Sequence, residues 1–154
     1  VVIDLGLCFC HVCLSVATAE QLAVGPMFTD GRASAERLCR DYEGRRDRVH
    51  EGLAAIPGLD PHRSEGSFYT MSRLPVDSGE TFAAWLLERF QHQGETVCLA
   101  PGEGFYVTPG SGVDEVRIAF MYDADTLARA MELLRLAVEA YPGRRGAAVA
   151  SSTG

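Results

Sequence analysis

Arg117 lies in the middle of an apolar stretch that has the character of a buried strand, Val116 to Phe120. A guanidinium keeps its charge near neutral pH, and burying that charge without a partner is very costly. Arg117 therefore either pairs with an internal carboxylate or stays open for an anionic ligand, whose carboxylate would fit its planar fork. Asp114 and Glu115 are too close along the chain to be ideal internal partners. The residues alone leave the two interpretations evenly balanced.

A second group with chemical potential is the cluster of Cys8, Cys10, His11 and Cys13. Thiolates and imidazoles bind zinc ions and iron–sulfur clusters. The spacing C-x-C-H-x-x-C is not a standard ligand pattern, and four ligands on so short a segment can hardly converge on one ion. We therefore interpret these cysteines as small buried apolar residues and expect no metal site.

Other reaction chemistries find little support in the chain. The four histidines are scattered and no Gly-x-Ser-x-Gly segment occurs, which argues against a nucleophilic triad. The pair Gly102 and Gly104 lacks the third glycine and the βαβ unit of a dinucleotide-binding fingerprint. All 14 basic residues are arginines, so no lysine is available to form a Schiff base.

Composition and charge narrow the class of protein. The chain has 154 residues, 47% of them hydrophobic, which suffices for one domain with its own core. A net charge of -7 argues against nucleic acid or an anionic membrane as partner. The apolar segment Val1 to Val16 is too short and too polar to span a membrane, and it lacks the basic start of a signal peptide. Five cysteines, an odd number, favour a reduced, cytoplasmic protein, and a start at Val suggests a truncated chain.

Periodicity predicts helices before and between short strands. A short helix is expected near Thr18, followed by a break over Gly25 to Gly31. A long helix is predicted over 33–56, with Leu38, Tyr42, Val49, Leu53 and Ile56 on one apolar face and a charged, solvated remainder. A strand over 65–71 and a helix beginning near Asp77 come next, with Asp77 and Glu80 at capping-box spacing and Gly94 after its end.

The second half of the chain is predicted to hold two strands and a last helix. A short strand over 96–100 leads into the glycine-rich loop 101–112, and the Arg117 strand follows. Asp123 or Asp125 is expected to cap a last helix that ends near Tyr141. The predicted fold class is α+β, a small sheet covered by helices.

Several motifs taken in order resemble the C-terminal part of class I/II aminotransferases, the fold-type-I enzymes of the α/β family that use pyridoxal phosphate. They are Gly66-Ser67-Phe68-Tyr69, Pro101-Gly102-Glu103-Gly104-Phe105, Val116-Arg117-Ile118-Ala119-Phe120 and the helix after them. The stretch Tyr42 to Arg48, with Gly52-Leu53 and Ile56-Pro57-Gly58 after it, is similar to the helix that links the two domains of these enzymes. The segment Gly104 to Gly110 is similar to aspartate aminotransferases.

The resemblance implies roles for four residues. It implies that Arg117 binds the α-carboxylate of an amino acid or 2-oxo acid substrate, and that Phe68 lines the same pocket. It also implies that Ser15 and Thr18 belong to a segment that approaches the active site of the partner subunit in a homodimer. The cofactor implied for the complete enzyme is pyridoxal 5'-phosphate, with the expectation that this chain alone does not bind it.

The chain also departs from the family pattern. The family's catalytic lysine lies upstream of the matching region, and Val1 to Cys13 does not match the segment that usually follows it. The resemblance thus divides the chain into a non-matching segment (1–14), a remnant of the large-domain edge (15–32), a small domain with the linking helix (33–141) and a disordered tail (142–154). It implies a fragment that is inactive alone. The alternative is a stand-alone, non-catalytic domain that binds a carboxylate or a protein.

Overall fold

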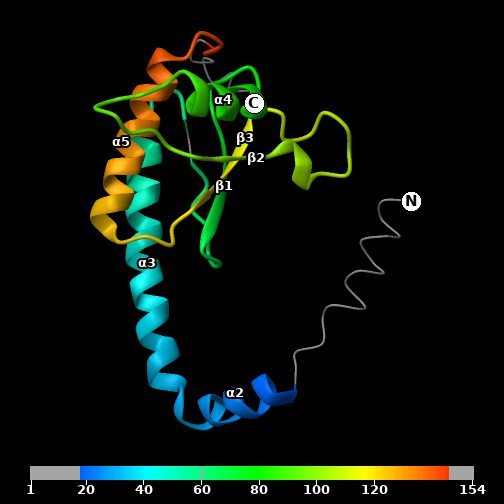
Figure 1. The fold of residues 1–154 in the computed structure, drawn as a ribbon, viewed down its shortest axis with the longest axis vertical. Helices are drawn as coiled ribbons and strands as arrows, with labels where there is room; N and C mark the ends of the chain where they lie inside the picture. The colour runs from blue at the N-terminus through cyan, green and yellow to red at the C-terminus, as the bar shows by residue number, and fades with distance from the viewer. Residues whose placement is uncertain (1–17, 60, 146–154) are drawn as a thin grey trace, which may run out of the picture. The chain divides into compact units, whose positions relative to one another are not determined.

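The computed structural model describes residues 18–59 and 61–145 of the chain. The chain divides into two compact units, with the boundary between Arg40 and Asp41. The described part of the first unit holds helix α2 (Thr18–Asp30) and the beginning of helix α3 (Arg32–Ala54). The second unit holds the rest of α3 and every strand of the described residues, and it contains the candidate site (Figure 1).

Helix α2 corrects one prediction. The break expected over Gly25 to Gly31 is wrong, because α2 continues through Pro26 to Asp30 and only Gly31 lies outside a helix. A proline inside a helix removes one backbone donor, but its fixed φ angle is itself helical, so a helix can pass through it at a cost. The carbonyl of Gly31 accepts the amide of Ala35 at 2.9 Å, close to the start of α3.

Helix α3 confirms the long helix that the periodicity predicted, with its end at Ala54 rather than Ile56. Val49, Leu53 and Ile56 are buried as expected, whereas Leu38 is exposed and is not part of the buried face. The predicted charged face is held together by local ion pairs, including Arg45 with Asp41 and Arg48 with Glu51.

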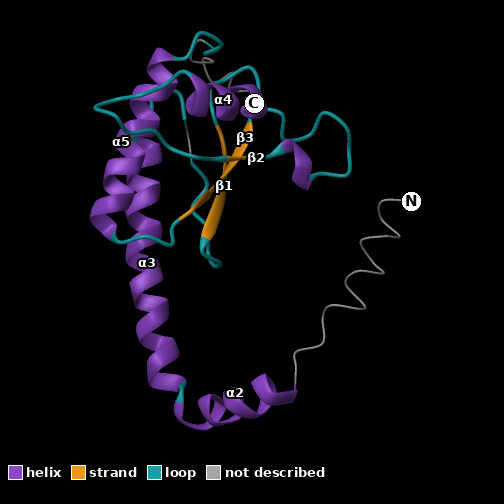
Figure 2. Ribbon diagram, viewed as in Figure 1, coloured by secondary structure: helices purple, strands orange, loops and turns teal. Residues whose placement is uncertain are grey.

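The sheet has three antiparallel strands in the order β1-β3-β2, namely β1 (Tyr69–Arg73), β3 (Glu115–Ala119) and β2 (Ala100–Pro101) (Figure 2). Arg117 pairs with Met71 on one side and Ala100 on the other. The strand predicted over 65–71 begins later, at Tyr69, because Ser67 has a left-handed φ of 67° that does not fit an extended strand. The strand predicted over 96–100 is wrong except at Ala100, because β2 covers only Ala100 and Pro101 and residues 96–99 are not in a strand.

Helix α4 (Gly79–Glu88) has a different cap from the predicted one. Ser78 is the N-cap residue, and its hydroxyl accepts the amide of Thr81 at 3.3 Å. Asp77 instead accepts the amide of Ser78 at 2.8 Å, so the expected box of Asp77 and Glu80 is wrong by one position. The helix ends well before Gly94, whose φ of +82° belongs to the turn between His92 and Glu95.

Helix α5 (Ala124–Ala140) confirms the predicted last helix, with Asp123 as its cap. The carboxylate of Asp123 accepts the amides of Asp125 and Thr126. Helix α5 lies against α3, where a side chain on Gly52 would come within 2.4 Å of the β-carbon of Met131. The two helices therefore approach each other as closely as they do only because position 52 has no side chain.

One core joins the helices to a single face of the sheet. It contains residues of α3, α4 and α5 together with Val116 and Ile118 of β3. The start of the predicted tail is also ordered, because Arg144 forms a bridge with Val76 and the carbonyl of Gly143 accepts the amide of Asp77. The α+β class, a small sheet covered by helices, is confirmed.

Candidate functional site

The two faces of β3 differ in what covers them. Val116 and Ile118 point into the core and are 0% and 4% exposed. Arg117, between them, points to the opposite face because side chains alternate along a strand. The strand pairing places Met71 beside Arg117 on this outer face, with Tyr69 one step along the same side of β1.

Among the described residues, the guanidinium of Arg117 contacts two aromatic rings and no carboxylate. Its central carbon lies 5.1 Å from the ring centroid of Tyr69 and 4.7 Å from that of Phe105. Both distances are within the range of a cation–π interaction. Across residues 18–59 and 61–145 no hydrogen bond or ion pair engages the side chain of Arg117, which is half-buried. The sequence left open whether Arg117 forms an internal ion pair or stays available for an anionic ligand. The described part of the chain provides no internal ion pair.

The carboxylate of Glu115, two residues from Arg117 on the same face of β3, is already engaged. Arg73 donates to its Oε1 at 3.3 Å, and the hydroxyl of Tyr106 donates to its Oε2 at 2.5 Å. This hydrogen bond raises the pKa of Tyr106 above its usual value, because the carboxylate stabilises the protonated phenol. Asp114 is held in turn by Arg73 and Arg145, at 3.2 and 3.3 Å.

Phe68 contacts Tyr69, which in turn contacts the guanidinium of Arg117. Its ring is 5.3 Å from Tyr69 in an edge-to-face arrangement and 6.4 Å from Tyr42, and it is half exposed. Tyr69 therefore separates Phe68 from the guanidinium. The predicted pocket role of Phe68 stays a prediction, with Tyr69 as the aromatic residue in direct contact.

The structure does not test the other predicted positions. Thr18 is exposed at the start of α2, in the first unit, and Ser15 lies outside the described residues. The cluster of Cys8, Cys10, His11 and Cys13 also lies outside them. Among the residues that the structure describes, no group of three or more His, Cys, Asp or Glu side chains could hold a metal ion. No helix in the same part of the chain is long and apolar enough to cross a membrane.

Sequence reasoning missed Tyr69 and Phe105 as neighbours of Arg117. The contact of Tyr69 follows from the register of β1 on β3, which no local pattern reveals. Phe105 lies in a short 3-10 helix, η1 (Glu103–Phe105), just after β2. A signal was present at Gly102, which must lack a side chain because a β-carbon there would come within 2.7 Å of Glu115. That close approach brings the Phe105 segment against the edge of β3.

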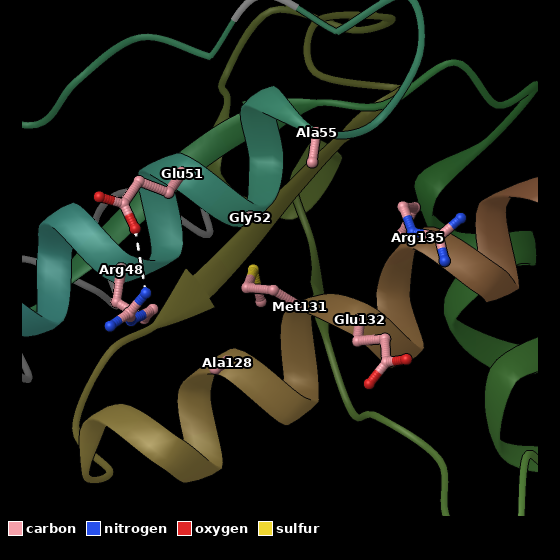
Figure 3. Close-up of a pocket in the computed structure, with 8 residues that line it drawn as sticks. All are labelled: Arg48, Glu51, Gly52, Ala55, Ala128, Met131, Glu132 and Arg135. Carbon is pink, nitrogen blue, oxygen red and sulfur yellow. Dashed lines mark hydrogen bonds and ion pairs between the residues drawn. The ribbon is translucent and has the colours of Figure 1, made fainter.

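A groove between α3 and α5 is a weaker candidate. Figure 3 shows Gly52 and Met131 facing each other there, with charged side chains at the edges, and the groove has a volume of about 300 Å³. Its two arginines are already paired, Arg48 with Glu51 and Arg135 with Glu139. The groove therefore offers no free cation to an anionic ligand, and we place the candidate site at Arg117.

The chain is similar in sequence to part of larger known proteins. No family model matches the chain. An aspartate aminotransferase from Musicola paradisiaca is 28% identical over 116 residues, and one from Pyrococcus horikoshii is 29% identical over 108 residues. These matches cover 71% and 69% of this chain but only 26% of either relative, so the chain spans about a quarter of their length.

A solved structure extends the similarity to the fold. The N-succinyldiaminopimelate aminotransferase from Mycobacterium tuberculosis superposes with a TM-score of 0.67 and 26% identity, over 83% of this chain and 33% of that one. The chain thus has the fold and the sequence character of the C-terminal part of fold-type-I, class I/II aminotransferases. The two curated relatives that it resembles are both aspartate aminotransferases.

The residues present do not fit the cofactor of that class on their own. Pyridoxal phosphate is held in such enzymes through a Schiff base with a lysine amine, and this chain contains no lysine. We therefore derive no reaction step through the cofactor from this chain.

Proposed function

We propose that Arg117 binds the carboxylate of a small amino acid or 2-oxo acid. The observation that carries this proposal is a half-buried guanidinium whose N–H groups have no acceptor among the described residues. Its contacts with Tyr69 and Phe105 involve the ring faces, and they leave the donors of the fork available. A carboxylate would accept two parallel hydrogen bonds from that fork.

The surroundings favour this ligand over water. Partial burial lowers the local dielectric and strengthens a charge-assisted hydrogen bond relative to one at a fully exposed site. The rings of Tyr69 and Phe105 also restrict the rotamers of Arg117, so less side-chain entropy is lost when a ligand binds. A fixed, partly dry and unpaired guanidinium is therefore suited to a small carboxylate.

In a complete protein, this site would be the substrate-binding side of a pyridoxal-phosphate-dependent aminotransferase that moves an amino group from an amino acid to a 2-oxo acid. That reaction needs a lysine, which this sequence does not contain, so we propose that the chain alone is inactive. The proposal includes a cytoplasmic homodimer in which Phe68 lines the pocket and Ser15 and Thr18 approach the partner subunit.

Titration of the 154-residue chain with aspartate and with 2-oxoglutarate, followed by calorimetry, tests the carboxylate site. We expect saturable binding that Arg117→Ala weakens by about ten- to a hundredfold, since hydrogen bonds to charged groups contribute about 1.5–3 kcal/mol. Arg135→Ala is the matched control, because Arg135 is an arginine of α5 that is paired with Glu139.

Two results would contradict the proposal. One is unchanged affinity in Arg117→Ala, which would place the carboxylate elsewhere. The other is the absence of binding in the unsubstituted chain, measured under conditions where its circular dichroism shows a folded protein.

A further inference from the structure

We propose that Tyr106 and Arg73 are positioning residues that hold the carboxylate of Glu115 away from Arg117, so that Arg117 stays free for a ligand. This inference rests on the proposed function of Arg117 and deepens it. It explains why an arginine two residues from a glutamate on the same strand has no ion pair. In the absence of the two contacts to Glu115, that glutamate would be the first competitor for the guanidinium.

Glu115 is placed to compete. Residues i and i+2 of a strand project from the same face and lie roughly 6.5 to 7 Å apart along it. Glu115 and Arg117 have this relation on β3, and their partners on β1 are Arg73 and Met71. The long side chains of glutamate and arginine span such a distance easily, and ion pairing would be favoured at a half-buried position.

Each oxygen of Glu115 instead has its own partner. Oε1 accepts from Arg73 Nη2 at 3.3 Å, and Oε2 accepts from the Tyr106 hydroxyl at 2.5 Å. The Glu115 side chain is only 17% exposed, whereas that of Arg73 is 71% exposed. Because an exposed arginine contributes little by itself, the short hydrogen bond from Tyr106 is the stronger of the two contacts.

Close backbone contacts fix both partners of that hydrogen bond. The amide of Gly102 donates to the backbone carbonyl of Glu115 at 2.7 Å, and a side chain on Gly79 would clash with the same carbonyl. A side chain on Gly112 would come within 2.3 Å of the Tyr106 ring, and the φ angle of Gly112 is +70°. The absence of side chains at Gly102 and Gly112 thus allows the loop to pack closely against the Glu115 backbone and the Tyr106 ring.

The first experiment uses Tyr106→Phe, which removes the hydroxyl and keeps the ring. Freed from this contact, Oε2 of Glu115 is expected to turn to Arg117. We expect aspartate to bind about tenfold more weakly in calorimetry, and the Nε–Hε resonance of Arg117 to shift in a nitrogen–proton spectrum of the ligand-free chain.

Rescue separates positioning from a merely structural role. The double variant Tyr106→Phe/Glu115→Gln removes the competing charge, so aspartate affinity and the Arg117 resonance should return close to their original values. Loss of affinity without rescue would mean that Tyr106 supports the site sterically, and it would overturn the proposal. Arg73→Gln, rescued in the same way, provides a second test at an exposed position.

The two measurements distinguish this proposal from the function on which it rests. If the unsubstituted chain does not bind aspartate, the proposed function fails, whereas the Arg117 resonance still reports whether Glu115 has moved. If Tyr106→Phe changes neither the resonance nor the affinity, the positioning role is wrong even though Arg117 binds the carboxylate.

Discussion

The two faces of the five-residue strand β3 differ in burial and in what surrounds them. On one face Val116 and Ile118 are buried in a core with residues of α3, α4 and α5. On the other face Arg117 contacts the partly exposed rings of Tyr69 and Phe105. The core face obtains its stability from apolar area removed from water, which depends on shape and volume. The outer face is organised by hydrogen bonds and ring contacts around a single charge. Substitutions on the two faces should therefore separate stability from binding.

The amount of exposed aromatic surface sharpens this difference. The rings of Tyr69, Phe105 and Tyr106 are 39%, 53% and 44% exposed, whereas Phe82 on the core side is fully buried. Exposed rings gathered near one guanidinium are typical of a surface that meets a ligand or another part of a protein. Aromatic residues thus pack in the core on one face and lie partly exposed beside a single charge on the other.

The largest effect is expected from Phe82→Ala on the core side. Phe82 is fully buried and packs against Tyr141, with ring centroids 5.0 Å apart. Removing the ring should lower the free energy of unfolding by about 3–5 kcal/mol, measured by urea denaturation. The aspartate affinity of the molecules that remain folded should be unchanged. A loss below about 1 kcal/mol would contradict the assignment of this face as the core.

An intermediate effect is expected from alkaline pH, through Tyr141. Burial, followed by its hydrogen bond to Asp77, raises the pKa of Tyr141 to about 12 from the ordinary 10.0. Because the folded pKa is the higher one, the contribution of this group is complete below pH 10 and is lost as pH rises through 12. The loss amounts to about 2–3 kcal/mol on the scale of 1.36 kcal/mol per pKa unit.

Thermal unfolding across this pH range checks the prediction, with Tyr141→Phe as the control. Phenylalanine keeps the ring and has no proton to lose, so the variant should show a flatter dependence of stability on pH. Equal slopes in the two proteins would show that other groups cause the alkaline loss.

The smallest effect on stability is expected on the outer face, from Tyr69→Ala and Phe105→Ala. Each removes one cation–π contact of about 0.5–1 kcal/mol at a partly exposed site. Stability should fall by about that amount, while aspartate affinity should decrease about two- to fivefold because Arg117 is less well oriented. A destabilisation comparable to that of Phe82→Ala would show that the two faces are not separable.

The sequence predicted those parts of the fold that local patterns determine. Asp123 and the apolar stripe of Leu127, Met131, Leu134 and Val138 specify α5 without help from the rest of the chain. The cap of α4 was misassigned because Asp77 and Ser78 are both good capping residues. Their roles depend on the return of the chain at Gly143 and Tyr141, which bond to Asp77.

The candidate site was predictable only in part, for a related reason. A charged residue in an apolar strand identifies Arg117 from local sequence alone, whereas its neighbours depend on strand register and on a loop. The adjacent residues Phe68 and Tyr69 illustrate this limit. Both are aromatic, but Phe68 precedes β1 whereas Tyr69 is its first residue, and the pairing of Tyr69 with Ala119 places Tyr69 against Arg117. Nothing within the motif itself distinguishes the two.

The central position of β3 has a consequence for how the site moves. Arg117 is paired with a strand on both sides, so its backbone amide should exchange with solvent only when the sheet opens as a whole. Phe105 and Tyr106, by contrast, lie in a loop, where their amides donate to the carbonyls of Gly102 and Glu103 within one turn. Because this turn does not depend on strand pairing, we expect these amides to exchange through local opening, before that of Arg117. The guanidinium and the rings beside it would thus belong to parts of the domain that open to different extents.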